Sequence, residues 1–151
     1  MSTFVIGVGR RSAGNDGVGP RVIDWLRKRT LPQGTALHVV REPSELLAFE
    51  AAQRLIVVDA VVGAPAPGQV VVLAAEALES MRAPAQGSHG ISLSDALALG
   101  RRLQGAAFPN ASVVGIGIGA PPKTPSVELD EDVAAAIETA GRAVLRLLSY
   151  T

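Results

Sequence analysis

Near its start the chain reads Thr3-Phe-Val-Ile-Gly-Val-Gly-Arg-Arg-Ser-Ala-Gly-Asn-Asp-Gly-Val-Gly-Pro20, and the order of elements follows from it. The continuous apolar run over 3–8 predicts a strand that is buried on both faces. The next segment, 10–17, is rich in Gly, Ser, Asn and Asp and predicts a loop. Beyond Pro20 the apolar residues recur with the spacing of one helical face, which predicts a helix that ends near Thr30.

The rest of the chain continues this alternation of strands and helices. Apolar runs predict strands at 37–40, 55–58, 69–73 and 111–116, and helical spacing predicts helices over 44–52, after residue 91 and after Asp130 as an N-cap. The Pro- and Gly-containing turn at 64–68 joins two of these strands so closely that we expect a hairpin. The alternation predicts one domain over residues 1–151, a three-layer α/β/α sandwich with a central five-stranded, mostly parallel sheet.

Composition excludes several classes of protein. The chain has 151 residues, is 48% hydrophobic and contains no cysteine, so we expect a self-sufficient core and exclude thiol catalysis and cysteine-based metal sites. A formal net charge of zero and only 3% aromatic residues argue against a nucleic-acid partner. The apolar run at 4–8 is too short for a signal peptide, and no run reaches the ~20 residues of a membrane span. We therefore expect a cytoplasmic monomer with no membrane partner.

The glycine-rich loop between the first strand and helix raises the possibility of nucleotide binding. A dinucleotide fingerprint needs glycine where Ser12 stands, and a P-loop needs Lys and Ser or Thr where Asn15 and Asp16 stand. The carboxylate of Asp16 would also repel phosphate. A non-catalytic module that binds a metal or a nucleotide on this scaffold is nevertheless the alternative to an enzyme.

Three polar residues fall in loops that we expect at one edge of the sheet. They are Asp16, Asp59 and His89, and ligands of open α/β sheets bind beyond the carboxyl ends of the strands. Two carboxylates and an imidazole can ligate nickel, zinc or a related divalent ion and leave positions open for a substrate. Two of them also have a structural reading, Asp59 as the cap of a turn or helix end and His89 as a solvated loop residue. The other histidine, His38, is expected to pack within a strand, and Ser88 lacks the surroundings of a nucleophilic serine.

In this order and spacing, the sequence resembles the [NiFe]-hydrogenase maturation endopeptidases along nearly the whole chain. The motifs that carry the resemblance are Ile6-Gly-Val-Gly9, Asn15-Asp-Gly-Val-Gly19, Ile56-Val-Val-Asp-Ala60 with Pro67-Gly68, Ser88-His89 with Leu93 and Leu97, and Val113-Val-Gly-Ile116. The resemblance implies a cytoplasmic hydrolase, an aspartic-type endopeptidase that removes the C-terminal extension of a hydrogenase large-subunit precursor once nickel is inserted.

The resemblance also implies roles for individual residues. It assigns metal contact and catalysis to Asp16, Asp59 and His89, with nickel recognised in the substrate rather than permanently bound. Two positions depart from the family pattern. Arg10 stands where asparagine is common, and the segment 41–44 reads Arg-Glu-Pro-Ser where an Asp-Gly-Gly-Thr-like loop takes part in choosing the precursor. We therefore expect the cleavage chemistry to be retained and the precursor to be unusual.

Overall fold

The computed structural model describes residues 2–49, 52–63, 65–80 and 92–149. The strands are β1 (Thr3–Val8), β2 (Thr35–Val40), β3 (Arg54–Val62), β4 (Val70–Ala74) and β5 (Asn110–Gly119); the α-helices are α1 (Val18–Arg27), α2 (Ala75–Ser80), α3 (Leu93–Gln104) and α4 (Glu131–Ser149); and the short 3-10 helices are η1 (Gly14–Gly17), η2 (Pro43–Ala48) and η3 (Gly105–Ala107). The strands form one sheet in the order β2-β1-β3-β5-β4, in which only β4 is antiparallel to its neighbour. The predicted fold class is therefore confirmed.

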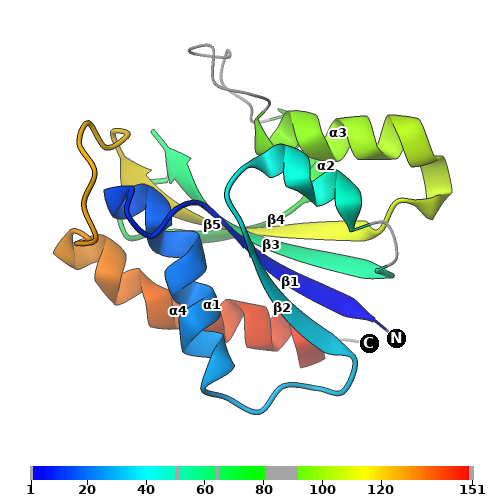
Figure 1. Cartoon of the computed structure of the whole chain (residues 1–151), viewed down its shortest axis with the longest axis horizontal. Helices are drawn as coiled ribbons and strands as arrows, with labels where there is room; N and C mark the ends of the chain where they lie inside the picture. Colours follow the sequence, from blue (N-terminus) through cyan, green and yellow to red (C-terminus); the bar gives the residue numbers. More distant parts are fainter. Residues whose placement is uncertain (1, 50–51, 64, 81–91, 150–151) are drawn as a thin grey trace.

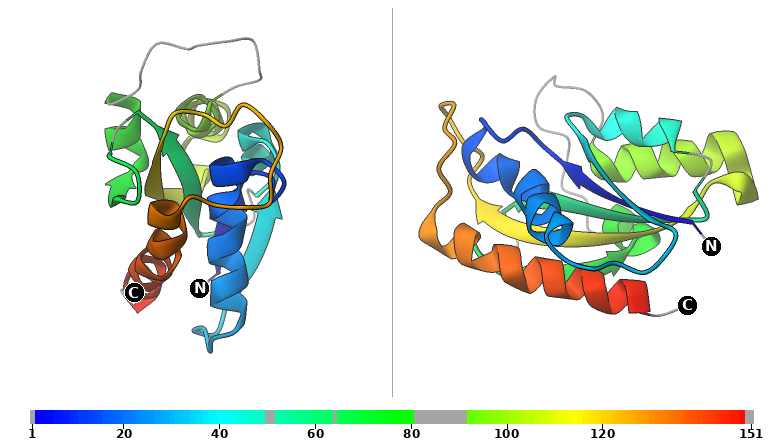
Figure 2. Two further views of the ribbon diagram at one scale, coloured as in Figure 1. Left: turned by 90° about the vertical axis from the view of Figure 1, so that its left-hand side faces the viewer. Right: turned by 60° about the horizontal axis from the view of Figure 1, so that its bottom comes forward.

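Helices cover both faces of this sheet, as the views in Figures 1 and 2 show. One face packs against α1 and α4, and the other packs against η2, α2 and α3. The central strand β3 supplies both cores in alternation, because successive side chains of a strand point to opposite faces. Ile56 and Val58 belong to the core under α1 and α4, whereas Leu55 and Val57 belong to the core on the opposite face. All four side chains are fully buried, as expected for a parallel sheet covered twice.

The predicted hairpin between the third and fourth strands is wrong. β4 pairs with β5 in antiparallel register, Val70 opposite Ile116 and Ala74 opposite Ser112. The reason is that β3 already has a parallel neighbour on each side, β1 and β5, so both of its hydrogen-bonding edges are occupied. The connection after β3 instead crosses the end of β5, where the Gly63 N–H donates to the Gly119 carbonyl at 2.9 Å.

One helix prediction also needs correction. The segment expected to be a helix over 44–52 is the shorter 3-10 helix η2, which begins at Pro43. Glu42 precedes it and forms a reciprocal capping box with Glu45, so the first turn is well satisfied although it does not continue. The last helix begins at Glu131, directly after Asp130, as predicted. Helix α2 was not predicted from the sequence.

His38 is confirmed as a packed residue. Its ring lies 5.0 Å from the rings of Phe4 and Phe49, measured between centroids, and those two phenylalanines meet edge to face at 5.5 Å. Of the two histidines in the sequence, His38 is thus part of the packing on the outer strand β2.

A separate finding concerns membranes: within the described residues, no helix is both long and apolar enough to cross one.

Candidate active site

The glycine-rich loop brings Asp16 to the carboxyl end of β1. The strand ends at Val8, and the N–H of Gly9 donates to the carbonyl of Val40 at 2.9 Å, which ties the start of the loop to β2. The loop then turns into η1, whose central residue is the half-buried Asp16. Helix α1 follows without a break, so the loop is fixed at both ends by buried elements.

Asp59 lies inside β3 rather than after it, because β3 runs on to Val62. Val58 is the last residue of β3 that pairs with β1, opposite Gly7, so Asp59 lies just beyond the reach of that strand. On the other side it is paired with Gly115 of β5. At this level of the sheet η1 packs beside β3 in place of β1. Because β1 ends at this level, η1 lies beside β3 and holds Asp16 near Asp59.

The pKa values of both carboxyl groups are raised, and the charge of Asp16 acts on Asp59. Burial raises the pKa of Asp59 well above its usual value, the charge of Asp16 raises it further, and a hydrogen bond from the Ala60 N–H at 2.8 Å opposes the shift. Burial also raises the pKa of Asp16, and the charge of Glu42 adds to this. Over the described parts of the chain, neither aspartate has a cationic partner. Two desolvated, unneutralised carboxyls in one place are typical of a site that receives a cation or handles a proton.

The third predicted residue, His89, lies outside the described residues, as does Ser88. Among residues that are described, no group of three His, Asp or Glu side chains is arranged to hold a metal. Asp16 and Asp59 are the described residues that could offer carboxylate oxygens to an ion at this edge of the sheet. The assignment of metal contact to His89 remains a prediction.

Long-range contacts hold the glycine-rich loop against the segment between β5 and α4. The Asn15 side-chain amide donates to Asp130 Oδ2 at 2.9 Å, and the Asp130 N–H donates to Asn15 Oδ1 at 2.8 Å. Near this pair the N–H of Gly14 donates to the Ser126 carbonyl at 2.7 Å, and the N–H of Ser126 donates to the Ser12 carbonyl at 2.8 Å. These contacts join residues more than a hundred positions apart and fix the backbone on both sides of Asp16.

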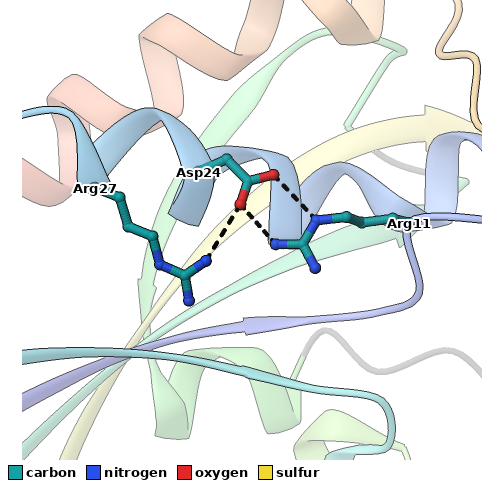
Figure 3. Close-up of polar contacts among 3 residues, drawn as sticks. All are labelled: Arg11, Asp24 and Arg27. Carbon is teal, nitrogen blue, oxygen red and sulfur yellow. Dashed lines mark hydrogen bonds and ion pairs between the residues drawn. The ribbon is translucent and has the colours of Figure 1, made fainter.

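The arginine pair after Gly9 adds two further anchors on different sides. Arg11 donates from Nε and Nη2 to the two carboxylate oxygens of Asp24 on α1, at 3.0 and 2.6 Å, and Arg27 lies 3.5 Å from the same carboxylate (Figure 3). The hydrogen bond from Arg11 lowers the pKa of Asp24. Arg10 instead pairs with Glu42 at 3.1 Å. The two positions that depart from the family pattern are therefore in contact beside Asp16.

We expect Asn15→Ala to lower the melting temperature by roughly 2–12 °C, because two hydrogen bonds worth about 0.5–1.5 kcal/mol each are lost. Asp130→Ala should cost about half as much, because it removes only the bond to Oδ2 while the backbone N–H of residue 130 still donates to Asn15, and the double variant should cost little more than Asn15→Ala alone. Thermal unfolding of the four proteins measures this. Additive losses would mean that Asn15 and Asp130 stabilise the chain independently.

Sequence reasoning missed Asn15, Glu42 and the segment 120–125 as neighbours of the site. Asn15 and Glu42 carry no local signal, because their partners are distant in sequence. The segment 120–125 could have been found, since it follows β5 and the carboxyl ends of all parallel strands lie at one edge of the sheet. Together with the glycine-rich loop, it lines an open groove of about 590 Å³ that includes Asp16.

Comparison with known proteins decides the family. A family profile described as hydrogenase maturation protease (HycI) matches residues 41–147, which is well over half of the chain. The chain belongs to the hydrogenase maturation protease family. The matched range includes Asp59 and His89, whereas Asp16 precedes it. A comparison with curated protein sequences finds no match.

Solved structures of hydrogenase maturation proteases extend the likeness over the whole chain. The hydrogenase maturating endopeptidase HybD of E. coli superposes with a TM-score of 0.78 at 28% identity, covering 98% of this chain and 92% of that protein. A hydrogenase 2 maturation peptidase from a Thaumarchaeota archaeon gives 0.69 at 27% identity, with both chains fully covered. HybD from Thermococcus kodakarensis gives 0.73 at 23% identity, covers 99% and 100% of the two chains, and at that identity supports the fold alone.

These findings confirm the family resemblance seen in the sequence. They favour an endopeptidase, a hydrolase, over the alternative of a non-catalytic metal- or nucleotide-binding module. The glycine-rich loop is accordingly part of a protease, and it carries Asn15 and Asp16 where a P-loop has Lys and Ser or Thr.

Proposed function

We propose that this protease removes the C-terminal extension of a [NiFe]-hydrogenase large-subunit precursor whose nickel has been inserted. The observation that carries the proposal is the pair of neighbouring, desolvated carboxyls, Asp16 and Asp59, which have no cationic partner among the described residues. A divalent ion brought by the substrate would neutralise them, while two carboxylates alone hold an ion poorly. A site of this kind responds to a metal that another protein already holds.

In this mechanism the nickel belongs to the substrate. Asp16, Asp59 and His89 would contact it and so place the scissile peptide at the end of β3. The metal would then polarise the scissile carbonyl or an attacking water, as metals do in other hydrolases. The carboxyls must be ionised to bind the metal. Because their pKa values are raised, they become protonated at a higher pH than ordinary aspartates when the pH is lowered, so cleavage should be lost at that higher pH. We propose an aspartic-type endopeptidase in this sense. The cytoplasmic location and the monomeric state remain predictions.

The test is cleavage of a nickel-loaded precursor, followed by mass spectrometry. We expect loss of the extension with the wild type and no cleavage of the nickel-free precursor. His89→Ala should abolish cleavage, and His38→Phe, which keeps the aromatic packing with Phe4 and Phe49, should cleave normally. Equal cleavage of the nickel-free precursor would overturn the role of nickel, and full activity of His89→Ala would remove that residue from the mechanism.

A further inference from the structure

An open groove lies beside Asp16, and the proposed chemistry does not use its walls. One wall consists of Arg10, Ser12 and Ala13 from the glycine-rich loop, and the other consists of residues 121–125, Pro-Pro-Lys-Thr-Pro. In the left view of Figure 2 the segment between β5 and α4 passes over the glycine-rich loop and η1. The groove is open to solvent and includes Asp16, so a chain lying in it would reach the proposed catalytic carboxyl.

The walls of this groove are already joined in the structure. The two backbone hydrogen bonds between Ser126 and the segment 12–14 connect them, and Arg21 donates a further hydrogen bond to the Val127 carbonyl. A side chain added at Gly14 would lie 3.5 Å from Pro122, so the walls are also in close approach there. A groove that is formed before binding loses little conformational entropy when a ligand enters.

Three cationic side chains lie on or next to this groove, and only one of them is free. Arg10 is paired with Glu42, and its neighbour Arg11 is paired with Asp24. Lys123 is exposed and lines the groove, and it has no partner within the part of the chain that the structure describes. The groove therefore offers one uncompensated positive charge to whatever binds there.

The chemistry of the second wall favours an extended peptide. Pro121, Pro122 and Pro125 present apolar rings against which the side chains of a bound chain can pack, and the fixed φ of proline limits the conformations of this wall. A peptide that contacts both Lys123 and Asp16 must extend along the groove, because both residues line it. We propose, resting on the proposed function, that this groove binds the C-terminal extension of the precursor as an extended chain and that Lys123 pairs with a carboxylate of that extension. Lys123 is then a specificity-determining residue.

The experiment measures cleavage of the nickel-loaded precursor by wild type, Lys123→Glu, Lys123→Gln and Lys28→Glu at low and high salt. Lys28 is the only other lysine in the sequence and directly follows the last residue of α1, so Lys28→Glu is a matched charge reversal outside the groove. We expect Lys123→Glu to lower kcat/KM about three- to tenfold at low salt through KM, with kcat unchanged. The difference should shrink at high salt, where exposed charges are screened. Lys28→Glu should match the wild type.

Changes in the precursor identify the carboxylate. Replacing the acidic residues of the extension by their amides should lower kcat/KM of the wild type by a similar factor and leave Lys123→Gln unaffected, which is the sign of a direct pair. Lengthening the extension with a flexible Gly-Ser tail moves the terminal carboxylate away. A loss caused by the amides assigns the pair to a side chain, whereas a loss caused by the tail assigns it to the terminus.

The outcomes separate this inference from the proposed function. If the wild type does not cleave the nickel-loaded precursor, the proposed function fails. If the wild type cleaves and Lys123→Glu has the same KM at low salt, the groove assignment is overturned. It is also overturned if Lys123→Glu and Lys28→Glu lose activity equally, or if only acidic residues on the subunit side of the cleaved bond matter.

Discussion

Asp59→Asn is expected to abolish cleavage of the nickel-loaded precursor and, at the same time, to raise the melting temperature at pH 7. Asparagine keeps the size of the side chain and can still accept the hydrogen bond from the Ala60 N–H. It removes a charge that is desolvated and repelled by Asp16. Loss of the ionisable group should reduce the rate at least about 100-fold. Relief of the unfavourable charge should stabilise the fold by about 0.5–2 kcal/mol.

The gain in stability should depend on pH with a defined sign. The pKa of Asp59 is higher in the folded protein than in the unfolded chain, so the folded state binds more protons between these two values. The contribution of Asp59 to stability is therefore fully present below its unfolded pKa and is lost as the pH rises through the folded pKa. Asp59→Asn has no such loss, and its advantage should grow with pH.

Thermal unfolding of both proteins, measured at about five pH values between roughly pH 4 and pH 8, gives this advantage. Asp132→Asn is the control, because Asp132 is an exposed residue in the first turn of α4. Its melting temperature should follow that of the wild type at every pH. An Asp59→Asn variant that still cleaves, or that is less stable than the wild type at neutral pH, would contradict the assignment of Asp59 to a catalytic site in which its charge destabilises the fold.

Of the proposed variants, Gly9→Ala should destabilise the protein most. It should lower the free energy of unfolding by about 2–4 kcal/mol, or the melting temperature by roughly 4–16 °C. Gly9 has φ +134°, a conformation that side-chain-bearing residues rarely adopt. A Cβ atom there would lie 2.3 Å from the backbone carbonyl oxygen of Asp16. Because that neighbour is backbone, η1 must shift as a whole and carry the Asp16 carboxyl with it. Cleavage should fall as well, since a misplacement of about 1 Å can cost about 100-fold in rate.

Gly105→Ala is the matched control for this variant. Gly105 also has a positive φ, +59°, but a Cβ atom there would meet nothing within 4 Å. We expect only the cost of this glycine-favouring backbone conformation, in which ψ is −133°, about 1–3 kcal/mol, and normal cleavage. Melting temperatures and cleavage rates of the two variants separate backbone strain from the close approach to Asp16. Equal losses in both would show that the contact with the Asp16 backbone has no separate cost.

The sequence by itself determined the order of strands and helices and two of the proposed site residues. Apolar periodicity is a local signal, and it correctly placed β1, α1 and the start of α4. It also placed Asp16 and Asp59 at the carboxyl edge of a parallel sheet, because strand polarity follows from the strand–helix alternation. It did not predict that β3 runs past Asp59, because the polar Asp59 interrupts the apolar run and marks its apparent end.

Only the tertiary structure decided which strands pair and which distant residues meet. β4 pairs with β5 because both edges of β3 are occupied by other strands, and competition for an edge has no signature within 59–73. The pairing of Asn15 with Asp130 and of Arg10 with Glu42 likewise depends on loops brought together by the sheet. The raised pKa of Asp59 has the same origin. Burial and neighbouring charge are properties of the assembled fold, and no residue type or spacing along the chain contains them.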